Sequence, residues 1–378
     1  MPSQITNYQC PACTGPLHYA GDSGMLECEY CGGKYTVAEI EKLYKEKDQS
    51  AAAAQAQAEA QQTAPTQSEA EGQWDYGGAG DDWGADAQHM KSYNCPSCGA
   101  ELICDDTTAA TSCPYCGNPS IVPGQFTNVL RPDYVLPFKL DKQAAVNALK
   151  KYYRGKKLLP KAFAAQNHIE EIKGVYVPFW LFDGKADADM RFAATRVQSF
   201  VRGDERVTIT EHYQVRRAGT VDFERIPVDA SSKMPDAHMD AIEPFDYGEL
   251  KAFSTAYLPG YLANKYDVSA DDCAARADER AENTAASIMQ ESVTGYATCI
   301  PQGRQVKLRR GSVKYALMPV WMLSTQWNGK NFLFAMNGQT GKLIGDLPVS
   351  KGRFLAWFAG IAVPLSALIM LFLSGGAI

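Results

Sequence analysis

The sequence lacks the motifs that identify most enzyme classes. Its five histidines form no HExxH pair, and it has no G-x-S-x-G turn and no dinucleotide fingerprint. The segment NGQTGK at 337–342 resembles a phosphate loop. However, Met336 stands where that loop needs glycine, and Leu343 stands where it needs serine or threonine. No catalytic constellation is found, so the sequence predicts a protein that is not an enzyme.

The chain also has no apolar run near its start. Residues 1–9 are polar and contain no basic stretch, which predicts that no secretory signal peptide is present. The bulk of the chain is then expected in the cytoplasm. In that reducing compartment eleven cysteines indicate metal sites rather than a disulfide framework.

A strong basic excess is missing as well. The formal charge is −6, but residues 48–90 carry eight acidic residues and no lysine or arginine, which leaves +2 for the remainder. Nucleic-acid-binding domains are usually clearly basic, so we expect no nucleic-acid partner. The alternative is a nucleic-acid-binding zinc-ribbon protein tethered to the membrane. Its contact would be the one dense basic patch, formed by Lys307, Arg309, Arg310 and Lys314.

Eight of the cysteines form two copies of one motif. CPAC at 10–13 is followed after fourteen residues by CEYC at 28–31, and CPSC at 95–98 is followed after fourteen residues by CPYC at 113–116. Four thiolates at this spacing make a tetrahedral site that selects Zn²⁺ and leaves no open position for substrate. The sequence therefore predicts two structural zinc ions, with the ligands Cys10, Cys13, Cys28 and Cys31, and Cys95, Cys98, Cys113 and Cys116.

Two redox CxxC pairs per copy are the alternative, but redox motifs usually accompany a βαβ pattern, which neither copy shows. The remaining cysteines, Cys104, Cys273 and Cys299, are predicted to be ordinary buried residues.

The motifs divide the chain into segments. Residues 1–47 are predicted to form the first zinc ribbon with a short helix opened by a Thr36–Glu39 capping box, and residues 91–125 the second ribbon. Between them, residues 48–90 are rich in Ala, Gln, Gly and acids, which predicts a disordered linker. Its aromatic residues Trp74, Tyr76 and Trp83 are interpreted as part of a plain linker, with a short docking motif as the alternative.

Residues 131–350 are predicted to form a duplicated α+β domain. VPFWLF at 177–182 and MPVWML at 318–323 share a Pro-x-Trp within an apolar strand, and a helix is expected before each. These helices are expected to begin at Asp141 and at Ser269. We expect Pro178 and Pro319 at sheet edges or strand starts, because proline cannot donate to a neighbouring strand.

Residues 354–374 contain no charged residue and would span about 31 Å as a helix at about 1.5 Å per residue. This predicts a single transmembrane helix, with a buried core helix as the alternative. Lys351 and Arg353 precede the segment and no basic residue follows it. By the positive-inside rule the protein is expected in the plasma (inner) membrane, with its bulk in the cytoplasm and its C-terminus outside.

Taken together, the paired cysteine motifs, VPFWLF, MPVWML, FAMNGQTGKLIGDLP at 334–348 and the hydrophobic tail resemble a family of bacterial membrane proteins. These proteins are described as containing a zinc ribbon of the transcription-factor-IIB type. The resemblance covers most of the chain from Asn94 onward. Similar members are encoded beside SPFH (flotillin-like) and phage-shock proteins, and help to place the phage-shock coat protein at the membrane.

The resemblance implies a non-enzymatic, membrane-anchored adaptor that recruits proteins in the membrane-stress response. Its implied partners are SPFH and phage-shock proteins, and the bilayer would be contacted through residues 354–374. The sequence leaves self-association into a homo-oligomer open.

Overall fold

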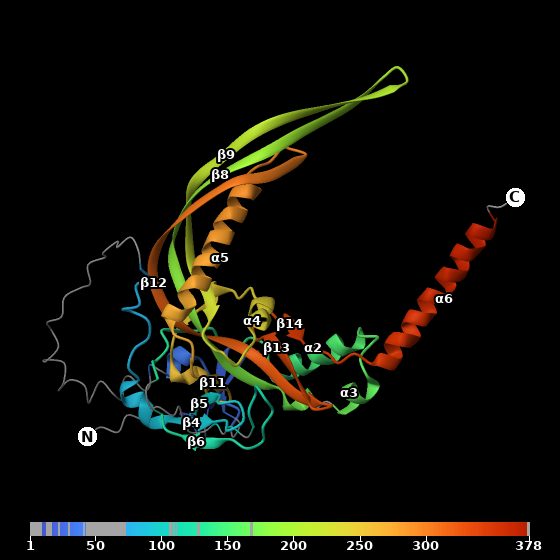
Figure 1. Cartoon of the computed structure of the whole chain (residues 1–378). Coiled ribbons are helices and arrows are strands. Elements are labelled where there is room, and N and C mark those ends of the chain that lie inside the picture. Colours follow the sequence, from blue (N-terminus) through green and yellow to red (C-terminus); the bar gives the residue numbers. More distant parts are fainter. Residues whose placement is uncertain are drawn as a thin grey trace.

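The computed structural model describes residues 10–12, 17–21, 23–28, 31–40, 42, 73–105, 108, 110, 112–126, 129–166 and 169–375. Over these residues the chain combines a small sheet, a large sheet and helices packed on them (Figure 1). The α+β class expected from the sequence is confirmed, whereas the duplication of the central region stays a prediction.

The small sheet belongs to residues 1–47, which we call the first cysteine-rich segment. Its antiparallel strands are β1 (Leu17–Ala20), β2 (Met25–Cys28) and β3 (Lys34–Tyr35), in that order. The backbone N–H of Thr36 then donates to the Glu39 carboxylate at 2.8 Å, and the N–H of Glu39 donates to the Thr36 hydroxyl at 3.2 Å. The predicted capping box is thereby confirmed, and residues 37–40 are helical.

The large sheet of the described residues has eleven strands. It runs β10-β7-β12-β8-β11-β5-β4-β6, while β9 pairs with β8, β13 with β12, and β14 with β13. The bounds are β4 (Met90–Asn94), β5 (Glu101–Asp105), β6 (Val122–Gly124), β7 (Tyr134–Val135), β8 (Lys173–Arg202), β9 (Glu205–Asp229), β10 (Lys251–Ala252), β11 (Leu262–Asn264), β12 (Thr298–Trp327), β13 (Lys330–Asn337) and β14 (Leu343–Gly345).

The helices connect these strands. They are η1 (Gly84–His89), α2 (Lys142–Arg154), α3 (Lys161–Gln166), η2 (Ile169–Glu171), α4 (Asp236–Ile242), η3 (Tyr247–Glu249), η4 (Thr255–Tyr257), α5 (Ala270–Glu291) and α6 (Lys351–Gly375). The predicted starts of α2 and α5 are confirmed. The Asp141 carboxylate accepts from the N–H of Ala144 at 2.7 Å, and the Ser269 hydroxyl accepts from the N–H of Asp272 at 3.2 Å.

The two Pro-x-Trp segments lie opposite each other on the central strands β8 and β12. In this antiparallel pair Pro178 faces Leu317 and Pro319 faces Tyr176, so the expectation that the prolines sit at edges or strand starts was wrong. Each proline lies where its strand changes its second neighbour. Strand β8 passes from β11 to β9 around Pro178, and β12 passes from β7 to β13 around Pro319. No neighbour needs the absent N–H at these points.

Side-chain alternation along β8 and β12 divides the core between the two faces of the sheet. On one face Tyr176, Trp180 and Phe182 pack with α2 and the first cysteine-rich segment; on the other, Val177 and Phe179 pack with the second cysteine-rich segment and α4. The central strands are therefore apolar on both sides, as expected of strands that are covered on both faces.

Beyond Phe182 the strands continue as a long arm. We define the arm as residues 184–223 of β8 and β9 together with residues 298–310 of β12. Helix α5 lies along one face of the arm (Figure 1). Small residues allow this close approach, because Ala281 and Ala285 of α5 and Ala186 and Ala188 of β8 are all buried. Only β8 and β9 reach the tip, which lies farthest from the rest of the sheet.

Residues 73–90 differ from the sequence prediction. The sequence places them in a disordered linker, but Trp74 and Trp83 are 4% and 6% exposed and pack edge-on against Phe182 and Phe253. The linker prediction is therefore corrected for this part, and residues 48–72 lie outside the described residues. Acidic composition did not prevent burial here, because the folded domain supplies the apolar surface that the segment itself lacks.

Candidate metal centres

The second cysteine-rich segment, residues 91–125, brings four thiol groups together. The sulfur atoms of Cys95, Cys98, Cys113 and Cys116 all lie within 4.8 Å of one another. Cys95 and Cys116 are 3.6 Å apart, as are Cys98 and Cys113. Four sulfurs at about 2.3 Å from a tetrahedral ion stand about 3.8 Å apart, so the set has the size of a metal site.

A repeated backbone turn positions these sulfurs. The N–H of Gly99 donates to the carbonyl of Cys95 at 2.9 Å, and that of Gly117 donates to the carbonyl of Cys113 at 3.0 Å. Both glycines have φ near +70°, a left-handed conformation that glycine adopts without strain. The glycine one residue after each CxxC therefore helps to position the sulfurs, because it turns the backbone and leaves both thiols of the pair on one side.

The surroundings of Cys95, Cys98 and Cys113 favour a bound cation. Burial raises the pKa of Cys98 to about 11, and burial raises that of Cys113 further. Cys95 behaves differently: burial also opposes its ionisation, but the N–H groups of Cys98 and Ser97 lower its pKa to about 7. Several thiolates cannot occupy one buried site unless a positive charge compensates them, and a divalent ion supplies that charge.

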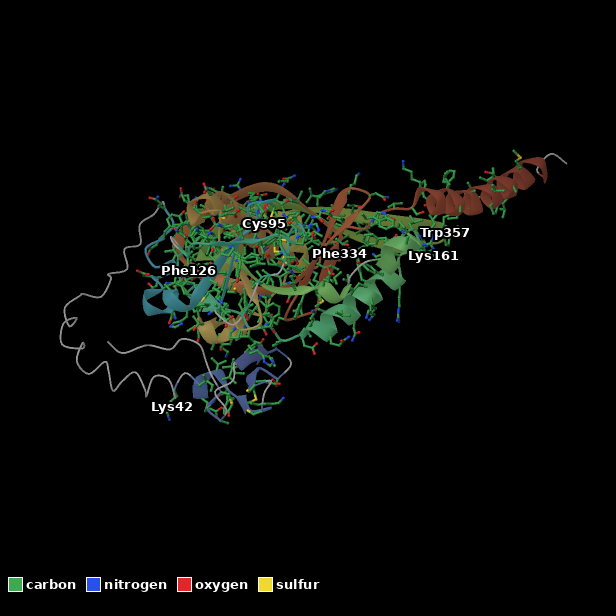
Figure 2. The ribbon with its side chains drawn as sticks, turned by 90° about the horizontal axis from the view of Figure 1, so that it is seen from below. Lys42, Cys95, Phe126, Lys161, Phe334 and Trp357 are labelled. Carbon is green, nitrogen blue, oxygen red and sulfur yellow. The ribbon has the colours of Figure 1, made fainter. Side chains whose placement is uncertain are left out.

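This centre is built into the large sheet. Strand β5 pairs with β11, which continues the sheet to β8, so the second cysteine-rich segment shares its sheet with residues 131–350. The Lys173 ammonium donates to the Ser112 carbonyl at 2.6 Å, and the Asn331 amide donates to the Tyr115 carbonyl at 3.1 Å. Figure 2 shows Cys95 among the side chains of the domain. Loss of this centre would therefore disturb the whole sheet.

The first cysteine-rich segment repeats the arrangement in its described residues. The sulfurs of Cys10, Cys28 and Cys31 lie within 4.8 Å of one another, and Cys10 and Cys31 are 3.4 Å apart. The N–H of Gly32 donates to the Cys28 carbonyl at 2.8 Å, as in the second segment. The fourth predicted ligand, Cys13, lies outside the described residues.

The first segment also packs against the domain. Tyr19 of β1 meets Tyr257 edge-on, with ring centroids 5.3 Å apart, and burial raises the pKa of Tyr19 to about 12. Gly21 lies so close to the backbone of Phe138 that a β-carbon there would stand 2.7 Å from the Phe138 carbonyl oxygen. No sequence pattern predicts this contact, because it joins surfaces far apart along the chain.

The other cysteines stand apart from the two described clusters. Cys104 and Cys273 are buried, and their sulfurs donate to the carbonyls of Thr108 and Asp229. Cys299 is only partly buried, so the prediction of an ordinary buried cysteine is wrong at this position.

Helix α6 is the one helix in the described part of the chain that is long and apolar enough to span a membrane. Within Lys351–Met370 none of the apolar stretch is buried against the protein, which contradicts the alternative of a buried core helix. Leu355, Val363 and Met370 are 63%, 66% and 72% exposed. Figure 1 shows α6 leading away from both sheets.

Comparison with known proteins gives one relative. The chain is 35% identical over 320 residues to the uncharacterized protein YdjG of Bacillus subtilis (strain 168), and the match covers 72% of this chain and 94% of YdjG. No family model and no solved structure matches the chain.

Proposed function

The chain belongs to the same family as the Bacillus subtilis protein YdjG, and we propose that it is a non-enzymatic adaptor held at a membrane by α6. The observation that carries this proposal is the apolar surface of α6, which the rest of the protein leaves uncovered. A long helix with apolar side chains on every side is stable in hydrocarbon and costly to expose to water.

The start of α6 is attached to the domain, which ties the domain to the membrane surface. The Arg353 guanidinium donates to the Leu159 carbonyl, and the Lys157 ammonium lies 4.4 Å from the centre of the Trp357 ring. Figure 2 labels Trp357 near the start of α6. Basic and aromatic residues at one end of an apolar helix suit the headgroup region. The domain then lies on the cytoplasmic side of the plasma membrane and the C-terminus outside.

Zn²⁺ is the proposed ion for both cysteine centres, with a structural role. Four thiolates fill a tetrahedral shell, and soft sulfur ligands select zinc over magnesium or calcium. The described sulfurs of both centres have the necessary spacing. The two segments are proposed to be zinc ribbons of the transcription-factor-IIB type, which agrees with the family resemblance of the sequence.

The arm offers the surface for a protein partner. Near its tip Phe200 and Val201 of β8 are 47% and 68% exposed, and Ile209 of β9 is 45% exposed. Phe200 faces Val207 across the hairpin. An apolar patch carried beyond the rest of the sheet can contact a partner without moving the domain. SPFH and phage-shock proteins are the proposed partners on the basis of the family resemblance.

The basic patch gives little support to the nucleic-acid alternative, because three of its four basic groups already have partners. Arg309 contacts Asp187 at 3.0 Å, Arg310 contacts Asp278 at 2.7 Å, and the Lys314 ammonium donates to the Gly78 carbonyl at 2.6 Å. Nucleic-acid binding needs basic groups that are free to neutralise phosphates and displace their counterions, and these three are occupied within the protein.

The test is a crosslinked pull-down from native membranes, read by mass spectrometry. It compares the intact chain, a chain lacking residues 1–47, and a chain whose tip residues 197–210 are replaced by a two-residue turn. Recovery of SPFH or phage-shock proteins that falls when one part is removed supports the adaptor and locates its contact. Recovery of nucleic-acid machinery alone, or of the same proteins at the same level from all three chains, contradicts it.

A further inference from the structure

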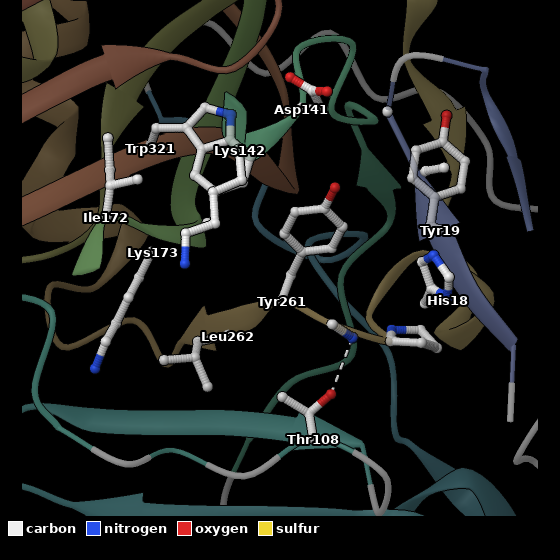
Figure 3. Close-up of a pocket in the computed structure, with 15 residues that line it drawn as sticks. His18, Tyr19, Thr108, Asp141, Lys142, Ile172, Lys173, Tyr261, Leu262 and Trp321 are labelled. Carbon is white, nitrogen blue, oxygen red and sulfur yellow. Dashed lines mark hydrogen bonds between the residues drawn. The ribbon is translucent and has the colours of Figure 1, made fainter. Parts of the chain in front are cut away.

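A cavity of about 530 Å³ lies between the first cysteine-rich segment and the domain. Figure 3 shows His18 and Tyr19 of β1 on one side, and Lys142, Trp321 and the strand residue Lys173 on the other. Cavities of this size hold small organic molecules. The zinc centres do not use this space, because no cysteine lines it.

Two lysines give the cavity a positive wall. The Lys173 ammonium is half-buried and is held by neutral groups of Ser112, its carbonyl and its hydroxyl. Burial lowers the pKa of Lys173 and the charge of Lys142 adds to this, while Cys113 and Glu171 oppose the shift. Within the described residues neither lysine has a carboxylate at ion-pair distance. An anion between them would relieve the repulsion of the two ammonium groups.

The acidic group of the cavity is already engaged. Asp141 lines the wall beside Lys142, but its carboxylate accepts the N–H of Ala144 as the cap of α2. Part of its charge therefore offsets the partial positive charge of the helix terminus.

One part of the wall is apolar and rigid. The Tyr261 ring stacks on Phe138 with centroids 4.2 Å apart, and the Trp321 indole is fixed by donation to the Leu140 carbonyl at 2.9 Å. Ile172 and Leu262 complete this side. A flat or short aliphatic group can pack on these side chains with little reorganisation.

We propose that the cavity binds a small amphipathic anion. Its phosphate, sulfonate or carboxylate group lies at Lys142 and Lys173, and its aromatic or short aliphatic part lies against Tyr261 and Trp321. Because β1 forms one wall, the site is complete only while the first cysteine-rich segment is docked. Binding therefore stabilises the docked arrangement.

The first test titrates phenyl phosphate into the full chain held in phosphatidylcholine nanodiscs, measured by calorimetry. Saturable binding to one site per chain is expected, tighter than binding of inorganic phosphate or of phenol. Lys142→Gln with Lys173→Gln is expected to weaken it at least tenfold, and Lys142→Gln alone several-fold. The single variant alters an exposed side chain at the start of α2 and leaves the fold intact. Lys151→Gln, on the exposed side of α2, is the matched control and should change nothing.

Absence of saturable binding, or equal affinity for the wild type and both variants, would overturn the proposal. Equal affinity for phenyl phosphate and inorganic phosphate would also overturn it, because the apolar wall would then have no role. Repeating the titration in nanodiscs containing phosphatidylglycerol distinguishes a lipid from a soluble anion as the natural source. A lipid that enters the site competes with phenyl phosphate and weakens its apparent affinity.

A second variant tests the role of docking. Gly21→Ala places a β-carbon against the Phe138 backbone and is expected to displace β1 and reduce phenyl phosphate affinity at least tenfold. Gly155→Ala, where an added β-carbon meets nothing within 4 Å, is the control. If Gly21→Ala binds like the wild type although chymotrypsin shows the first segment released, β1 is not part of the site and the proposal falls.

Discussion

The indole N–H of Trp74 donates to the Asp278 carboxylate at 3.1 Å, across 204 positions of the sequence. The same carboxylate accepts two hydrogen bonds from Arg310, at 3.1 and 2.7 Å. Trp74 therefore joins residues 73–90 to α5 and β12 at once. Residues 73–90, which we call the strap, are thereby attached to the base of the arm.

Replacing Trp74 with alanine is expected to release the strap. The change removes a 4%-exposed ring and leaves part of Asp278 without its donor, which should cost about 3 kcal/mol of stability. The thermal unfolding midpoint should fall, and chymotrypsin should cut at Tyr76 and Trp83 under conditions that spare the wild type. Tyr76→Phe is the control, because it loses one exposed hydrogen bond to Asp271. Equal protection of all three chains would show that the strap is not held by Trp74.

Loss of one cysteine centre should affect the stability of the protein differently from loss of the other. Cys95→Ser is expected to remove one zinc ion per chain and to lower the unfolding midpoint of the whole domain, because β4 to β6 belong to the large sheet. Metal content by mass spectrometry and a thermal melt measure both effects. Cys104→Ser is the matched control, since that sulfur donates to Thr108 and is outside both clusters. Unchanged metal content in Cys95→Ser would contradict the zinc assignment.

Cys28→Ser should have a more local effect. It is expected to remove the other zinc ion and unfold the small sheet, while the large sheet and membrane insertion persist. Metal content, together with fractionation of membranes, measures this. Loss of the variant from the membrane fraction would contradict the separation between the first centre and the anchor.

Local signals explain the parts of the fold that the sequence predicts. Asp141 and Ser269 cap α2 and α5 as expected, because a capping residue acts within one turn of its helix. The Asn328-Gly329 turn between β12 and β13 has φ values of 50° and 72°, because an Asn-Gly pair tolerates the left-handed conformation that a two-residue hairpin turn requires. The CxxC spacing likewise places both thiols of a pair within one turn.

Nonlocal packing explains what the sequence does not predict. The arm requires strands of 30 residues, and such length depends on pairing between segments far apart in the chain. Trp83 lies in a stretch whose composition indicates disorder, yet it is buried by Phe126 and Phe253. Lys142 and Lys173 meet at a cavity only because β1 docks opposite them.

A charge in α6 should prevent membrane insertion. Leu365→Arg places a guanidinium near the middle of the apolar segment, at a cost of about 2.5–3.5 kcal/mol on insertion scales. The variant should be extracted from membranes by alkaline carbonate, whereas the wild type remains. Val349→Arg is the control, since Val349 is also apolar and exposed but precedes the helix. Retention of Leu365→Arg in the membrane would contradict the anchor.

The buried carboxyl of Asp229 should make stability depend on pH. Its side chain is 2% exposed, and burial raises its pKa to about 6, although Arg276 lies 2.9 Å away; Asp236 and Asp240 surround the same guanidinium and add to the rise. The folded state therefore holds this proton more tightly than the unfolded state. The resulting stabilisation is complete below the ordinary pKa of an aspartate and is lost as the pH rises through 6.

The Asp229→Asn variant has no ionisable side chain at this position, so its stability does not decrease in this way as the pH rises. Relative to the wild type, its free energy of unfolding should increase by roughly 1 kcal/mol between pH 5.5 and pH 8. Urea unfolding of the full chain in nanodiscs, followed by tryptophan fluorescence at both pH values, measures the difference. Asp222→Asn is the matched control, because that carboxylate is 70% exposed beside Lys185 and its substitution should shift stability equally at both pH values. A difference between Asp229→Asn and the wild type that does not change with pH would mean that Arg276 keeps Asp229 ionised throughout this range.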